Sequence, residues 1–250
     1  MIRRSRAYRR AITLAAWLLL LGALPRPAAA EGFPSSKSLD PWRPPSPSRS
    51  GIQVPKRAWV VLAAGGIVAR ESLRHENAAE AAHVLDRSFL DGPADVGNVW
   101  GSGLTIAAGS AGLYGLGALA GTPKLREAGM DLGTAFVATS AVVWPMKLFV
   151  DRTRPSGGRY SFPSGHTALA FASAPVLSAH FGPVVGIPAY ALAGMTALGR
   201  MEERKHYLSD VVFGGAVGLA VGLTVARRAS LRSAPEFMLT SRGVALTARF

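Results

Sequence analysis

The sequence contains no cysteine and few charged residues. Its 250 residues include no Cys, and Asp, Glu, Lys and Arg together make up 17%, against about 25% in a typical soluble domain. The absence of cysteine excludes disulfide bonds, thiol catalysis and thiolate metal ligands. Hydrophobic residues make up 49% and there are 28 glycines. This composition suits closely packed helices in a membrane or in a very apolar core.

Acidic residues are scarce relative to basic ones. The chain has 28 Lys and Arg against 15 Asp and Glu, a formal net charge of +13. A nucleic-acid-binding protein would present its basic residues on a polar face that also carries aromatic side chains. Here they lie mostly between apolar segments, as expected for loops that flank membrane spans or for a site that binds an anion. We therefore expect a membrane and an anionic substrate as partners, and no nucleic acid.

Residues 1–30 have the pattern of an export signal. The basic stretch "MIRRSRAYRR" precedes the apolar "AITLAAWLLLLGAL", and Ala28 and Ala30 form an A-x-A pattern before Glu31, as at signal cleavage sites. We predict a cleaved signal peptide, with an uncleaved signal anchor as the alternative, and both place residue 31 on the far side of the inner membrane. Residues 31–56 are rich in Pro and Ser and predict an extended linker.

Residues 57–228 lack the alternating pattern of strands and predict a helical domain. Residues 58–69 are apolar but too short to span a bilayer, and residues 71–91 predict a polar amphipathic helix and loop. Apolar blocks close to spanning length follow, at residues 99–121, 132–150, 166–181, 183–199 and 207–226. We predict an all-α helical bundle with transmembrane helices. A soluble all-α domain is the alternative.

The C-terminal part of the chain has two local patterns. Gly214, Gly218 and Gly222 recur at every fourth position of the last block, so that this helix can approach a neighbour closely. The tail, residues 229–250, contains two short β-like runs around "SRG" and predicts a small hairpin.

The basic residues between the blocks predict a topology. If residue 31 is outside, the basic segments 122–129 and 226–232 are expected in the cytoplasm. The loops 151–165 and 200–206 then face the periplasm, and three polar clusters lie at the outward ends of the apolar blocks.

The first cluster is "KLFVDRTRP". Lys147 and Arg154 are seven residues apart, about two helical turns, so they could share one helix face before Pro155 ends the helix. Taken alone, basic residues at a helix end are equally well explained by snorkelling or by the helix dipole.

The second cluster is "PSGH", residues 163–166. It predicts a helix start with Ser164 as the cap and Gly165 in the first turn. The unpaired N–H groups of a helix N-terminus bind phosphate well. His166 beside them could hold or donate a proton near neutral pH.

The third cluster is "GRMEERKHYLSD". Arg200 precedes His206 by six residues and Asp210 follows it by four, a spacing that places the last two on one face of a helix. The Asp210 carboxylate could then fix the tautomer of His206 and raise the nucleophilicity of its other nitrogen. Alone, a surface His–Asp pair beside a basic loop is the simpler interpretation.

Together the clusters supply three cations, a helix N-terminus and two histidines, without a group of acidic residues that would hold a metal. This set suits phosphoryl transfer without a metal, in which cations neutralise the phosphate oxygens, one histidine attacks and the other protonates the leaving oxygen.

Residues 95–228 resemble the type-2 phosphatidic acid phosphatase family, which is related to class A acid phosphatases and vanadium haloperoxidases. The family signature is K-x6-R-P, then P-S-G-H, then S-R-x5-H-x3-D. The matching residues are Lys147, Arg154 and Pro155, then Pro163, Ser164, Gly165 and His166, then Arg200, His206 and Asp210. Two positions depart from the family: Gly199 stands where serine is usual, which removes a hydroxyl from the phosphate site, and Tyr207 stands where tryptophan is frequent.

The resemblance implies a role for each matching residue. His206 is expected to form a phosphohistidine and Asp210 to orient it, while His166 is the general acid and then the base for water. The phosphate is expected to be held by Lys147, Arg154, Arg200 and the backbone of Ser164 and Gly165.

We therefore predict a phosphatase, independent of metals and cofactors, that acts on a lipid phosphate or diphosphate at the periplasmic side of the inner membrane. A soluble periplasmic acid phosphatase and a vanadate-dependent haloperoxidase are the alternatives. A non-catalytic membrane protein that binds phosphorylated lipid is a third interpretation, against which the intact His166, His206 and Asp210 argue. Phosphatidic acid, phosphatidylglycerol phosphate, polyprenyl diphosphate and lipid A all present similar phosphates.

Overall fold

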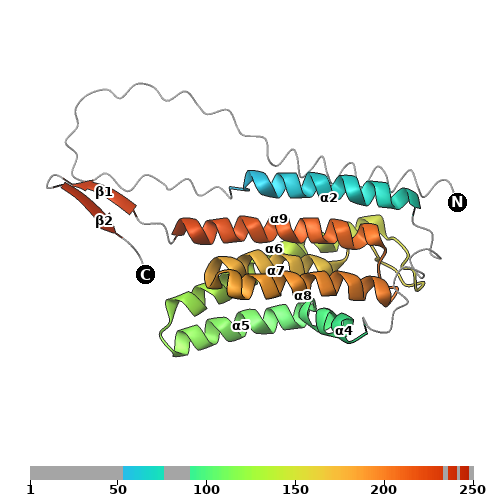
Figure 1. Ribbon diagram of the computed structural model, residues 1–250, viewed down its shortest axis with the longest axis horizontal. Coiled ribbons are helices and arrows are strands. Elements are labelled where there is room, and N and C mark those ends of the chain that lie inside the picture. The colour runs from blue at the N-terminus through green and yellow to red at the C-terminus, as the bar shows by residue number, and fades with distance from the viewer. Residues whose placement is uncertain (1–52, 76–90, 233–235, 241–242, 248–250) are drawn as a thin grey trace, which may run out of the picture. The chain divides into compact units, whose positions relative to one another are not determined.

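The structure is a computed structural model that describes residues 53–75, 91–232, 236–240 and 243–247 (Figure 1). The helices are α2 (Lys56–His75), α4 (Asp91–Trp100), α5 (Gly103–Leu119), α6 (Pro123–Val150), α7 (Gly165–Phe181), α8 (Pro183–Glu202) and α9 (Leu208–Arg232). They confirm the predicted helical bundle. The predicted signal, most of the linker and most of residues 71–91 lie outside the described residues, so the predicted domain limits stay predictions.

The tail contains one antiparallel pair of strands, β1 (Glu236–Thr240) and β2 (Gly243–Thr247). In their register Glu236 lies opposite Thr247 and Thr240 lies opposite Gly243. The pairing therefore extends over the whole length of both strands.

Helix α6 begins about two turns earlier than the hydropathy pattern predicts. Pro123 occupies the first turn, where its missing N–H costs nothing, and the polar "KLREAG" that follows is helical. The basic segment 122–129 is therefore almost entirely part of α6, because polar first turns lower hydropathy without ending a helix.

Two other helix boundaries follow local sequence signals. The predicted block 99–121 is divided, since α4 ends at Trp100 and the Ser102 side chain caps α5 by accepting a hydrogen bond from Thr105 N at 3.1 Å. The predicted turn between α7 and α8 is confirmed, with Gly182 at a φ of 73° and Pro183 in the first turn of α8.

Three of the described helices, α6, α8 and α9, are long and apolar enough to cross a membrane, whereas α5 is a shorter apolar helix. Large apolar side chains project from the outer faces of the spanning helices: Phe149 on α6 is 81% exposed and Val184 on α8 is 83% exposed. Such exposure is unfavourable in water and natural against lipid.

Helix α7 packs against α6, α8 and α9. Its contact with α9 depends on the glycine stripe, since a Cβ on Gly218 would stand 2.1 Å from the carbonyl oxygen of Ala168 and a Cβ on Gly214 would stand 2.5 Å from that of Ser164. The predicted close approach is therefore confirmed, and α7 is the partner helix. This contact places the first turn of α9 directly against the first turn of α7.

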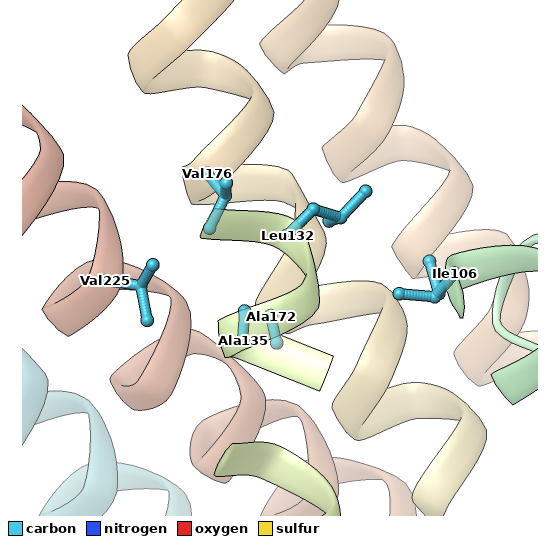
Figure 2. Packing of buried hydrophobic residues seen from close by; sticks show 6 residues of the cluster. All are labelled: Ile106, Leu132, Ala135, Ala172, Val176 and Val225. Atoms are coloured by element: carbon cyan, nitrogen blue, oxygen red, sulfur yellow. The ribbon is translucent and has the colours of Figure 1, made fainter. Parts of the chain in front are cut away.

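A small apolar core joins four of these helices. Figure 2 shows its members, which are Ile106 of α5, Leu132 and Ala135 of α6, Ala172 and Val176 of α7, and Val225 of α9. Four of these six side chains are alanine or valine, so the backbones lie close together and fix the relative positions of the helix ends.

Candidate active site

The three predicted clusters meet at one end of the bundle. Consecutive helices alternate in direction, so the end of α6, the start of α7, the end of α8 and the start of α9 lie at the same end (Figure 1). A Cβ on Gly165 would lie 3.6 Å from Cε of Lys147, and His166 lies within the fields of Lys147, Arg154, Arg200 and His206.

The first cluster is divided between a helix and a loop. Lys147 is buried near the end of α6 and its Nζ donates to the carbonyl oxygen of Tyr160 at 2.8 Å. The helix ends at Val150, with Asp151 in the left-handed region at a φ of 41°. Arg154 therefore lies in the loop, and the predicted shared helix face is wrong.

The second cluster forms the start of α7. Ser164 is fully buried at the cap position, but its hydroxyl bonds Thr167 Oγ1 at 2.9 Å and makes no capping bond. Its backbone N–H donates to the carbonyl oxygen of Asp210 at 2.9 Å, and the first intrahelical hydrogen bond is donated by Ala168 N. The Ser164 N–H is therefore already bonded within the protein, and the first-turn amides from Gly165 onward are the ones that lack an intrahelical partner.

Arg200 is held at the end of α8 by a contact from α4. Its Nη1 donates to Glu203 Oε2 at 2.8 Å and to Asn98 Oδ1 at 3.3 Å, and Asn98 Nδ2 in turn donates to Glu203 Oε1 at 2.6 Å. The sequence predicts a loop or cap role for Asn98. No motif in the sequence links Asn98 with Arg200, which is more than a hundred positions away.

His206 and Asp210 are not on one helix face, because α9 begins at Leu208. His206 Nδ1 lies 3.7 Å from Asp210 Oδ2, which is too long for a hydrogen bond. Oδ2 instead accepts hydrogen bonds from Tyr207 N at 2.9 Å and from the Ser161 hydroxyl. The predicted shared helix is therefore wrong, whereas the predicted proximity of the two side chains is found.

Sequence reasoning missed Arg152, which contacts the third cluster. Its Nη1 donates to Asp210 Oδ1 and to Ser209 Oγ, both at 2.7 Å. Its guanidinium carbon lies 3.8 Å from the ring centroid of Tyr207. The side chain is therefore fixed by an ion pair, a hydrogen bond and a cation–π contact at once.

The two histidines lie outside the three spanning helices and have lowered pKa values. Burial lowers the pKa of His166 to about 4, and the charges of Arg200, His206, Lys147 and Arg154 act in the same direction. Burial also lowers the pKa of His206, which the nearby Asp210 carboxylate partly offsets. Both imidazoles are therefore neutral at pH 7 in the free protein.

The site contains buried nitrogen atoms without partners. Arg154 Nε, Arg200 Nε and His206 Nδ1 are buried and have no hydrogen-bond partner among the described residues. Unsatisfied buried polar atoms are costly, and neighbouring cations repel one another. A tetrahedral oxyanion could accept hydrogen bonds from Arg154 Nε and Arg200 Nε and would neutralise the repulsion between the cations. Within the described part of the chain, no group of three His, Asp or Glu side chains could hold a metal ion.

Comparison with known families and structures agrees with this geometry. A family model described as the PAP2 superfamily matches residues 128–233. This range contains every predicted site residue.

Two individual proteins are similar to this chain. A lipid A 1-phosphatase of Porphyromonas gingivalis is 41% identical over 75 residues, which is 28% of this chain and 17% of that protein. The crystal structure of a transmembrane PAP2-type phosphatidylglycerolphosphate phosphatase from Bacillus subtilis is similar with a TM-score of 0.51 at 18% identity, covering 70% of this chain and 93% of that one. The second similarity concerns the fold alone.

Proposed function

We propose that this chain is a phosphatase of the PAP2 superfamily, whose model matches residues 128–233, and that it hydrolyses a phosphorylated membrane lipid through a phosphohistidine intermediate. The observation that carries the proposal is the set of unpartnered nitrogen atoms on Arg154, Arg200 and His206, gathered beside the first turn of α7. The nitrogen atoms of Arg154 and Arg200 can bind the equatorial oxygens of a phosphoryl group while the imidazole of His206 attacks its phosphorus.

The two neutral imidazoles have complementary roles. Because His206 Nδ1 faces Asp210, the lone pair of its Nε2 attacks phosphorus and the bond from phosphorus to the lipid oxygen breaks. His166 gives a proton to that leaving oxygen. It then takes a proton from water, whose oxygen attacks phosphorus, and the P–N bond breaks to release phosphate and neutral His206.

The proton that His166 donates arrives with the substrate. In the free protein the pKa of His166 is lowered to about 4 by burial and by the surrounding cations. A bound phosphate neutralises those cations and favours the imidazolium. A monoanionic phosphate ester can therefore deliver both the negative charge and the proton.

The phosphate is held by Lys147, Arg154 and Arg200 together with the first-turn amides of α7. Ser164 acts differently from the expectation, because its N–H is bonded to the carbonyl oxygen of Asp210. Its part is to join the starts of α7 and α9, so that the amide of Gly165 and the histidines keep a fixed separation.

Two observations support a lipid substrate. Three helices long and apolar enough to cross a membrane, with apolar side chains exposed on them, support a site at the end of a membrane-embedded bundle. The similar proteins are a lipid A 1-phosphatase and a phosphatidylglycerolphosphate phosphatase. The direct test is phosphate release by the purified protein from a panel of these lipids, phosphatidic acid and a polyprenyl diphosphate. We expect activity in EDTA, inhibition by vanadate, and no activity in His206→Ala. Equal release by His206→Ala would contradict the mechanism.

The export-type N-terminus supports a periplasmic site, as do the basic residues Lys124, Arg126, Arg227 and Arg228 at the opposite end of the bundle. The absence of native cysteine makes the test simple. In intact cells, a membrane-impermeant maleimide should label Ser156→Cys, in the exposed site loop, and should label Lys124→Cys only after lysis. The reverse pattern would place the site in the cytoplasm.

A further inference from the structure

Arg152 connects two parts of the site that are far apart in the sequence. It lies in the loop after α6, between Lys147 and Arg154, yet its contacts are with Tyr207, Ser209 and Asp210 at the start of α9. Its side chain is 16% exposed and that of Asp210 is fully buried. An ion pair in such a place is much less screened than one at the surface.

The hydrogen bonds of Asp210 show what Arg152 does. Oδ1 accepts from Arg152, and Oδ2 accepts from Ser161 and from the backbone of Tyr207. These bonds direct Oδ2 toward His206, but they leave Nδ1 at 3.7 Å. The carboxylate is therefore ionised and oriented toward His206, while the guanidinium of Arg152 neutralises part of its charge.

We infer that Arg152 is a positioning residue that acts through Asp210. It holds the attacking histidine in place and limits how strongly the Asp210 carboxylate attracts the proton on the imidazole ring of His206. The inference rests on the proposed phosphatase function. In this inference Arg152 itself does not contact the phosphate.

The charges that act on His206 come from every element around it. Lys147 of α6, Arg200 of α8 and Asp210 of α9 act on His206 directly, and His166 of α7 is coupled to His206 and is itself influenced by Arg154 in the loop after α6. Only Asp210 is negative. Any change in how strongly Asp210 acts on His206 is therefore visible as a change in the pH dependence of the reaction.

The test compares Arg152→Met with Arg159→Met. Arg159 is in the same loop and pairs with Asp151 on the surface, with side chains 66% and 38% exposed.

Loss of Arg152 exposes His206 to the full carboxylate charge and loosens Asp210. We expect kcat to fall on the order of 10- to 100-fold, as for other residues that act through a neighbour. We also expect the acid limb of the kcat profile to move up by about one pH unit. Arg159→Met should have the same kcat and the same acid limb of the kcat profile as the unmodified protein.

Two further measurements separate positioning from folding and from binding. Arg152→Lys keeps the positive charge, so we expect it to restore the acid limb while recovering only part of kcat, because lysine lacks the planar group that stacks on Tyr207. The affinity for vanadate should stay within about threefold in Arg152→Met, since the phosphate ligands are unchanged.

The outcomes distinguish this inference from the proposed function. An unchanged acid limb in Arg152→Met, or a loss of vanadate affinity as large as the loss of kcat, would overturn the positioning role while leaving the phosphatase proposal intact. Failure of the proposed function would instead appear in the unmodified protein, as absence of phosphate release from every lipid tested.

Discussion

Asp210 Oδ2 and His206 Nδ1 face each other across 3.7 Å without a hydrogen bond. The carboxylate is satisfied by Arg152, Ser161 and Tyr207, so the free protein is in a state in which the orienting bond has still to form. Because catalytic hydrogen bonds in free enzymes are often long and tighten with substrate, this separation is compatible with the proposed attack by His206.

Asp210→Asn should abolish most of the activity while the phosphate site persists. Asparagine keeps an oxygen near His206 but loses the charge that stabilises the developing imidazolium, so we expect kcat to fall by about 10²–10⁴-fold. The unpaired Arg152 should also lower stability, by up to about 3 kcal/mol. Steady-state kinetics and thermal unfolding in detergent measure the two effects. Wild-type kcat in Asp210→Asn would contradict an orienting role for this residue.

Gly218→Ala should separate α7 from α9 and so reduce both stability and activity. The added methyl would meet the carbonyl oxygen of Ala168 at 2.1 Å, and overpacking of this kind costs about 1–3 kcal/mol. Gly109→Ala on α5 is the matched control, because its Cβ would meet nothing within 4 Å. It should leave stability unchanged or raise it by up to about 1 kcal/mol. If both variants unfold at the same temperature, the glycine stripe is not a packing requirement.

Asn98→Ala should weaken substrate binding more than it slows the chemical step. Asn98 contacts both Arg200 and Glu203, so its removal loosens a phosphate ligand without touching the histidines. We expect KM to rise roughly 3- to 10-fold, the effect of about 1 kcal/mol of lost hydrogen bonding, with kcat changed less. Asp95→Asn, at an exposed position on the same helix, should have no effect. A fall in kcat with KM unchanged would exclude this role for Asn98.

The reaction should favour mildly acidic pH. His166 has a lowered pKa of about 4 in the free protein, through burial first and neighbouring cations second, so above that pH its proton must come from the substrate. A phosphate monoester loses its second proton near pH 6, and kcat/KM should then fall by about tenfold per pH unit at higher pH. Burial also lowers the pKa of His206, which favours the neutral form of this nucleophile at mildly acidic pH. A constant kcat/KM from pH 5 to 8 would contradict this account of the proton.

The sequence predicts the bundle and the main site residues because each is encoded locally. The Gly182–Pro183 turn and the glycine stripe are short patterns with one structural meaning. The three clusters meet because alternate ends of antiparallel helices coincide, which follows from helix order alone.

The sequence does not predict the contacts that surround those residues. Arg152 reaches Asp210 across 58 positions, and Arg200 reaches Asn98 across 102. The first contact depends on how the loop after α6 folds, and the second depends on how α4 packs against α8. The spacing of His206 and Asp210 suggests a helical pair, but α9 starts between them. Local spacing is informative only within one element, and the start of an element depends on tertiary contacts such as the bond from Ser164 N to Asp210 O.

The central claim is that His206 becomes phosphorylated during lipid hydrolysis. The most direct measurement is a rapid-quench reaction with a lipid labelled with ³²P in its terminal phosphate, followed by mapping of the label on the protein. The account predicts an acid-labile, base-stable label on His206 that forms and decays within one turnover and is absent from His206→Ala. Phosphate release without any label on His206, or label on another residue, would contradict it.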